Sequence, residues 1–135
     1  MVGALLRRPL HHVRTRIVAA LESAGMEAIS ATHLNVFQHP GPEGLRPTDL
    51  ARRADMTKQS MNHLLSELEG AGYIERRTAR RDGREKEVWL TPRGADAVQV
   101  IRQAVGDIER EWQDLLGESR YRTFRESLIL LNSPQ

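Results

Sequence analysis

The stretch from Thr57 to Gly94 constrains the fold most, because it sets an Asp-Gly pair between two short segments of strand character, with a helix signal on each side. Asp-Gly is a strong signal for a tight turn between antiparallel strands. Apolar and polar residues predict these strands over 73–77 and 87–91. We therefore expect a β-hairpin whose tip lies at Asp82-Gly83.

The helix expected before the hairpin has a core stripe and an opposite polar face. Thr57 is a good N-cap, and the helix should run over 58–71 before Gly72 closes it. Apolar residues at i, i+3, i+4 and i+7 form the core stripe, which is Met61, Leu64, Leu65 and Leu68. At about 100° per residue, the opposite face and its flanks hold Gln59, Ser60, Asn62, His63 and Ser66. The first two turns should therefore expose short side chains that form hydrogen bonds.

A shorter helix precedes this one, and a long helix follows the hairpin. Pro47 suits a first helical position, and Asp49 complements the positive end of the helix dipole. A tight turn over 55–57 separates the two helices, and Thr91-Pro92 supplies an N-cap and a first residue for the long helix. Two helices joined by a tight turn and followed by a β-hairpin make a winged helix-turn-helix.

The rest of the chain is expected to be helical, which makes the fold mostly α with a small β-hairpin wing. A shorter helix is expected over 29–39, before the prolines and glycines of 40–44. The long helix has apolar steps of 3, 4, 3, 4 and 3 residues, which is typical of a coiled-coil seam that needs a partner surface. The N-terminal stripe is Leu6, Leu10, Val13, Ile17 and Leu21, up to a stop near Gly25. The seam is Val98, Ile101, Val105, Ile108, Trp112 and Leu115, and after Gly117 a last helix continues it with Tyr121, Phe124, Leu128 and Leu131.

Positive charge is concentrated in the expected hairpin. The formal net charge of the whole chain is only +2. Within residues 76–86, however, six cations face two anions, which gives a local net charge of +4. A balanced protein with a basic patch at a hairpin tip is suited to a polyanionic partner at that patch.

Other classes of protein are disfavoured by what the sequence lacks. It contains no cysteine, which removes disulfides, thiolate metal sites and cysteine nucleophiles. Its longest fully apolar run, residues 17–21, is far shorter than the roughly 20 residues of a membrane span, and no secretion signal is evident. We therefore expect a cytoplasmic protein with no membrane partner. Its five histidines lack a paired metal-ligand spacing and no catalytic motif is present, so no enzyme activity, metal or cofactor is expected.

Two stretches resemble the MarR family of bacterial transcriptional regulators. The first is LARRADMTKQSMNHLLSELEGAGYIERR, and the second is DGREKEVWLTPRG. The second stretch is similar to the family's wing pattern through Asp82, Arg84, Val88, Leu90 and Thr91, with Gly94 after them. The resemblance covers nearly the whole chain.

The resemblance implies a homodimer with one winged helix per subunit on a pseudo-palindromic operator, more often as a repressor than as an activator. It also implies a small-molecule effector that changes DNA affinity. Residues 1–135 would form one domain, with dimerisation helices over 1–28 and 92–135 and a DNA-binding region over 29–91. Two departures are Asp55, where the family commonly has glycine, and the more basic segment before the wing.

Candidate contacts with double-stranded DNA lie on the second helix of the motif. Gln59 or Asn62 is suited to an adenine edge, and His63 or Lys58 to a guanine or a phosphate. Near the helix N-terminus, Thr57 and Ser60 are suited to phosphate oxygens. The alternative is a solvated polar face with no ligand.

Candidate contacts in the wing are Arg80, Arg81 and Arg84, which are suited to phosphates or to a narrow minor groove. Asp82 is included because it is expected either beside DNA or paired with Arg84. For Arg77, at the root of the strand, DNA and a salt bridge to the second strand are both open.

The alternative function is a winged-helix protein-interaction module without operator binding. By resemblance, a sensory pocket would lie where the long helix meets the first two helices, and His33, Phe37 and Trp112 are candidates for its lining. The operator, the regulated genes and the effector are not specified by the sequence.

Overall fold

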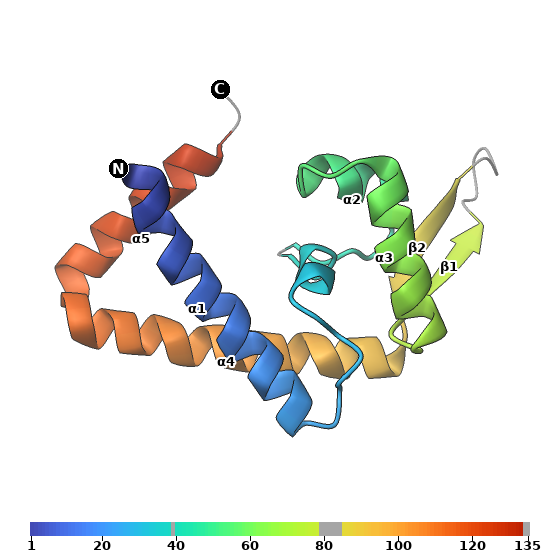
Figure 1. The fold of residues 1–135 in the computed structure, drawn as a ribbon, viewed down its shortest axis with the longest axis horizontal. Coiled ribbons are helices and arrows are strands. Elements are labelled where there is room, and N and C mark those ends of the chain that lie inside the picture. Colours follow the sequence, from blue (N-terminus) through green and yellow to red (C-terminus); the bar gives the residue numbers. More distant parts are fainter. Residues whose placement is uncertain (39, 79–84, 134–135) are drawn as a thin grey trace.

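The structure is a computed structural model of the chain, and it describes all residues except 39, 79–84 and 134–135. Helix α1 crosses the long helix α4, and α5 folds back toward the N-terminal end of α1 (Figure 1). The smaller elements gather over the first part of α4, on the other side of α1 (Figure 1). The elements are α1 Val2–Ser23, η1 Thr32–Asn35, α2 Pro47–Arg53, α3 Lys58–Gly70, β1 Ile74–Thr78, β2 Lys86–Leu90, α4 Pro92–Leu116 and α5 Glu118–Asn132.

The helix-turn-helix has the predicted caps. Pro47 opens α2, and the Thr57 hydroxyl accepts a hydrogen bond from the Ser60 N–H at 3.1 Å, which caps α3. All four residues predicted for the core stripe of α3 are buried. In the turn between the helices, Asp55 has a φ of 54°, in the left-handed region that favours glycine.

The hairpin pairs β1 with β2 in antiparallel register, from Ile74 opposite Leu90 to Thr78 opposite Lys86. A residue before α2 extends this sheet, because the Leu45 carbonyl accepts a 2.8 Å hydrogen bond from the Val88 N–H. The predicted Asp82-Gly83 turn lies outside the described residues.

Both strands are shifted by one residue from the predicted 73–77 and 87–91. Tyr73 is excluded from β1 because its N–H bonds the Leu68 carbonyl at 2.9 Å and closes α3. Thr91 is excluded from β2 because its hydroxyl caps α4 by accepting from the Gly94 N–H at 3.1 Å. Helix caps at both outer ends therefore set where the strands begin and end.

The helix predicted over 29–39 was wrong, because only the short 3-10 turn η1 forms there. Its i→i+3 hydrogen bonds continue to Phe37, whose N–H donates to the Leu34 carbonyl at 3.2 Å. At the start of the segment, the Ser30 N–H donates to the His33 side chain at 2.9 Å. The prolines that follow at 40 and 42 lack an N–H and leave little room for a full helix.

The core joins buried side chains of α1, the segment around η1, α2, α3, the hairpin and α4. Ile17 and Leu21 of α1 are buried, whereas Leu6 and Leu10 near its N-terminus are exposed. Much of the seam predicted to need a partner is covered within the chain, because α1 packs across α4 (Figure 1). A 3-4 apolar repeat does not specify whether its own chain or another covers it. The far end of the seam remains open, and Leu115 is 81% exposed.

Candidate nucleic-acid interface

The N-terminal half of α3 presents polar side chains to solvent. Lys58 and His63 have side chains that are 59% and 75% exposed, and Gln59 and Ser60 are also exposed. Thr57, at the cap, donates its hydroxyl proton to Ser60 Oγ at 2.9 Å. The structure therefore brings together on one helix end the candidates predicted there.

The last turns of the same helix carry opposite charge. Glu67 and Glu69 are half-exposed, and Glu67 Oε1 lies 3.4 Å from the Nε2 atoms of both His63 and the buried His33. The positive end of the helix dipole and Lys58 lie at the other end of α3. A polyanion would therefore be attracted to the first two turns and repelled by the last.

Arg76 of β1 fastens the hairpin to α3. Its guanidinium donates to Asn62 Oδ1 at 3.2 Å and to Ser66 Oγ at 2.7 Å, and it lies 3.6 Å from Glu69. Asn62 is half-buried by its position beside this group. The hairpin and the polar face of α3 are thus joined by direct hydrogen bonds.

Arg77 points away from α3, since neighbouring residues on a strand face opposite sides. Its Nη2 atom lies 2.6 Å from Glu75 Oε1, and its guanidinium carbon lies 4.9 Å from the centroid of the Trp89 ring. Arg77 is therefore held by an ion pair and a cation–π contact on the other face of the hairpin. The structure does not bring it together with the candidates on α3.

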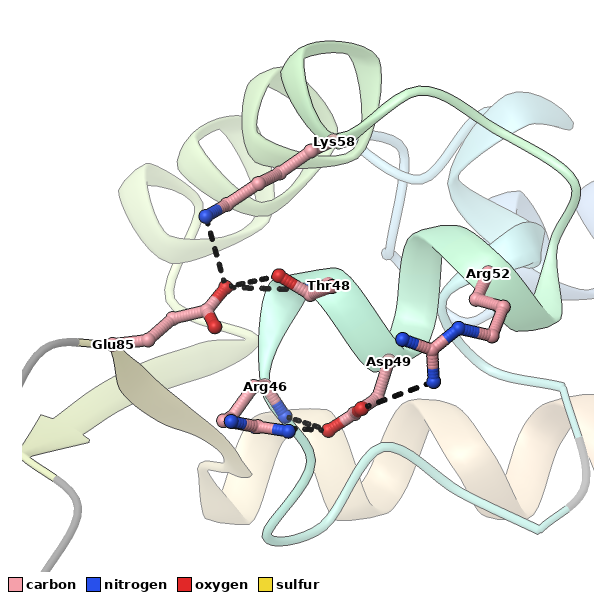
Figure 2. A network of polar contacts seen from close by, with 6 residues as sticks. All are labelled: Arg46, Thr48, Asp49, Arg52, Lys58 and Glu85. Carbon is pink, nitrogen blue, oxygen red and sulfur yellow. Dashed lines mark hydrogen bonds and ion pairs between the residues drawn. The ribbon is translucent and has the colours of Figure 1, made fainter. Parts of the chain in front are cut away.

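A second contact joins the hairpin to both helices of the motif through Glu85, one residue before β2 (Figure 2). Glu85 Oε1 accepts from the Thr48 hydroxyl at 2.8 Å and from the Thr48 N–H at 3.2 Å. The same oxygen lies 3.4 Å from Lys58 Nζ. Desolvation raises the pKa of Glu85, but the Thr48 hydrogen bonds and the Lys58 charge outweigh it and leave this pKa below its usual 4.5.

Asp49 organises the start of α2 beside this contact (Figure 2). Its Oδ2 atom accepts from the Arg46 N–H at 3.2 Å and from Arg46 Nε at 3.3 Å, and Arg52 lies 3.7 Å from Oδ1. Desolvation raises the pKa of Asp49, but the bonds from Arg46 and the nearby charges lower it overall. The predicted role of Asp49 at the helix start is confirmed by this geometry.

The predicted wing-tip residues lie outside the described part of the chain. They are Arg80, Arg81, Asp82 and Arg84. The contacts of Thr48 and Glu85 were not anticipated from the sequence, because Glu85 resembles any other charge-balancing residue in a basic run. No simple spacing rule relates it to Thr48, 37 positions away.

A hollow of about 450 Å³ lies between α1, the η1 segment and α4. Of the three candidates for the lining of a sensory pocket, Phe37 lines this hollow. Trp112 lines other hollows beside Phe124, and His33 is buried against Ser30 and Glu67. Its apolar wall includes Leu10, Val13, Ile17, Leu34, Phe37, Val98, Ile101 and Val105. Its polar groups include Arg14, Asn35, Gln38, Arg102 and Glu109.

No group of three or more His, Asp or Glu side chains suited to a metal ion occurs among the described residues. Within those residues, no helix is long and apolar enough to cross a membrane.

Comparison with known proteins identifies the relatives of this chain. The family model of the MarR family matches residues 30–85, from just before η1 to the residue before β2. The HTH-type transcriptional repressor Rv2887 of Mycobacterium tuberculosis is 31% identical over 133 residues, which is 98% of this chain and 94% of the relative. The chain belongs to the MarR family.

Solved structures agree with this assignment. The Rv2887 structure in complex with salicylic acid is 28% identical, with a TM-score of 0.66 and coverage of 97% of this chain and 96% of that one. The repressor CouR of Rhodococcus jostii RHA1, bound to a 23-mer DNA duplex, shares the fold with a TM-score of 0.78 at 18% identity, covering 98% of this chain and 93% of that one. Members of the MarR family are transcriptional regulators, so this chain is a DNA-binding regulator rather than an enzyme.

Proposed function

We propose that this MarR-family protein is a cytoplasmic repressor that binds its operator through the N-terminal half of α3 and the wing. The observation that supports this most is the exposed, polar start of α3, which is joined to the hairpin by Arg76 through Asn62 and by Glu85 through Lys58. The residues proposed to contact DNA are Thr57, Lys58, Gln59, Ser60, Asn62, His63, Arg77, Arg80, Arg81, Asp82 and Arg84.

We propose a homodimer as the DNA-binding unit. Apolar side chains remain exposed at the ends of α1, α4 and α5, including Leu5, Leu115 and Leu131. Burial of such residues against a second copy would remove apolar surface from water. The proposed division is one domain over 1–135, with dimerisation segments 1–28 and 92–135 around a DNA-binding region 29–91, on a pseudo-palindromic operator.

We propose that the hollow between α1, η1 and α4 binds an aromatic carboxylic acid as effector. Its walls are largely apolar, and Arg14 and Arg102 supply cationic groups at its lining. Rv2887, which is related along nearly its whole length, has been solved with salicylic acid and with p-aminosalicylic acid. A ligand that favours one arrangement of α1 against α4 would shift the population of DNA-binding dimers.

The test is fluorescence anisotropy on a labelled duplex enriched by the protein from random DNA, with a scrambled duplex of equal composition as control. We expect selective binding and a log–log salt slope that steepens by about 0.9 for each phosphate neutralised. Salicylate added to the complex should lower the affinity for the enriched duplex. Equal binding to both duplexes would favour the protein-interaction module, and indifference to salicylate would contradict the effector class.

A further inference from the structure

The Glu85 carboxylate joins three separate parts of the DNA-binding region. Glu85 lies at the loop end of the hairpin, one residue before β2, Thr48 lies in the first turn of α2, and Lys58 is the first residue of α3 (Figure 2). One carboxylate oxygen receives all three contacts, at 2.8, 3.2 and 3.4 Å. The Glu85 side chain is only 19% exposed, so water competes poorly for these contacts.

Of Thr48 and Lys58, which contact the Glu85 carboxylate, Lys58 has the more flexible side chain. A lysine side chain is a flexible stem with a compact charge, and its ordering on binding costs conformational entropy. Because Lys58 is 59% exposed, its ammonium group would be free to sample many positions without an anchor. The carboxylate of Glu85 gives that ammonium group a fixed position between the start of α3 and the loop end of the hairpin.

We propose that Glu85 is a positioning residue for DNA recognition. It holds the loop end of the hairpin, α2 and the Lys58 ammonium group in their relative places before DNA arrives. This inference rests on the proposed interface, because Lys58 and the wing are the groups that it orders. A surface whose side chains are already ordered loses less conformational entropy when it binds DNA, and its affinity is higher as a result. This increase in affinity applies only to DNA whose phosphates and bases match the ordered side chains.

Charge alone predicts the opposite effect. An anionic side chain beside a DNA-facing lysine repels phosphates and opposes binding to every duplex, whatever its sequence. If Glu85 acted only through its charge, removing it would tighten binding to all DNA. If Glu85 acts by positioning, removing it weakens binding to the matched operator alone.

The variants for the test are Glu85→Ala, Glu85→Gln and the control Glu87→Ala. Glu87 lies two residues further along the same hairpin arm, and within the described residues it makes no contact with Thr48 or Lys58. Glu87→Ala therefore removes the same charge and leaves the contacts of Glu85 in place. Glu85→Gln keeps an acceptor for Thr48 and loses the attraction for Lys58.

Each protein is titrated by anisotropy onto the duplex that the wild type enriches from random DNA and onto its scrambled counterpart. We expect Glu85→Ala to lose about tenfold in affinity for the enriched duplex, equivalent to about 1.4 kcal/mol, with no loss on the scrambled one. Glu85→Gln should lose less, and Glu87→Ala should show no selective loss. A cooperative urea unfolding transition shows that each variant is folded.

Two results would overturn the inference. The first is Glu85→Ala binding the enriched duplex as tightly as the wild type or more tightly, and the second is an equal loss on both duplexes. Should Glu85→Ala fail to fold, the same comparison holds for Glu85→Gln against Glu87→Ala. Wild-type protein that binds both duplexes alike would overturn the proposed interface as well. If the wild type discriminates and Glu85→Ala discriminates equally well, the positioning role alone is overturned.

Discussion

Asp55 adopts a backbone conformation that glycine would adopt at lower cost. Its φ of 54° lies in the left-handed region, where a side chain meets the following carbonyl group. The family resemblance places glycine at this position, and the positive φ of Asp55 gives the physical reason why glycine suits it. The turn nevertheless keeps the two helices of the motif in place, with Thr57 capping α3 as predicted.

The first prediction at the residue scale concerns this turn. Asp55→Gly should be more stable than Asp55→Ala by about 1 kcal/mol, because both variants lose the carboxylate and only alanine keeps a Cβ in the left-handed region. Urea denaturation of the two variants at pH 7 measures the difference. Equal midpoints, or a higher midpoint for Asp55→Ala, would show that the turn carries no such strain.

The second prediction uses the lowered pKa of Glu85. A carboxyl group with a lower pKa in the folded state stabilises the protein above its unfolded pKa, and that contribution is lost as the pH falls through the folded pKa. The free energy of unfolding of the wild type should therefore exceed that of Glu85→Gln most at pH 7. The gap should narrow as the pH falls below about 4.5.

Urea unfolding of both proteins between pH 7 and pH 3.5 measures this gap. Asp49, whose pKa is also lowered, is present in both proteins and cancels in the comparison. A gap that stays constant or widens toward low pH would contradict the assigned ion pair and hydrogen bonds of Glu85.

At the scale of elements, the helix caps and the buried apolar stripes of the helices were predictable from the sequence, whereas the tertiary contacts between elements were not. Thr57, Thr91 and Pro92 fix helix starts through local chemistry, and all three act as predicted. The one-residue shift of both strands arises because Tyr73 and Thr91 are used by neighbouring helices, which the strand pattern alone does not reveal. The helix expected over 29–39 does not form, because tertiary packing and the nearby prolines override the helical preference of a short apolar repeat.

One prediction at this scale concerns the junction of α4 with the hairpin. A Cβ added at Gly94 would lie 1.9 Å from the Tyr73 carbonyl oxygen, a backbone atom that cannot swing aside. Gly94→Ala should therefore lower the free energy of unfolding by about 1–3 kcal/mol or more.

Gly70→Ala is the matched control, since a Cβ at Gly70 in α3 meets nothing within 4 Å. That substitution should be neutral or stabilising by up to about 1 kcal/mol, through helix propensity. Thermal melting of both variants gives the comparison, and a Gly94→Ala variant as stable as Gly70→Ala would show that the junction is looser than described.

For the whole molecule, the sequence predicted a winged helix with long helices, but it did not specify which apolar surface stays open. The stripes on α1 and α4 cover one another, and the Arg16 guanidinium reinforces their crossing through Glu111 at 2.7 Å. The structure shows which apolar residues of α1 and α4 are buried within the chain and which, near the helix ends, are exposed; the sequence pattern does not distinguish them. The polar side of the candidate DNA surface was predictable because helix periodicity defines it, whereas the Glu85 contacts depend on distant parts of the chain.

The prediction at this scale concerns the dimer. Leu115→Asp places a charge on an 81% exposed apolar residue of α4 and should shift the protein toward monomer, with weaker operator binding. Gln103→Asp, at an exposed polar position on the same helix, should leave the dimer intact. Sedimentation velocity over a concentration series distinguishes them, and a Leu115→Asp protein that remains dimeric would exclude this end of α4 from the interface.

The most direct test of the central claim is the base preference of α3 itself. Wild-type protein and Gln59→Ala are each used to select duplexes from random DNA, and the enriched sequences are compared. We expect the variant to lose its preference at one position in each half-site, because a base contact by an amide discriminates by about 1–3 kcal/mol, while the rest of the site is retained. Identical preferences for the two proteins would contradict the assignment of Gln59 as a base-contacting residue of the recognition helix.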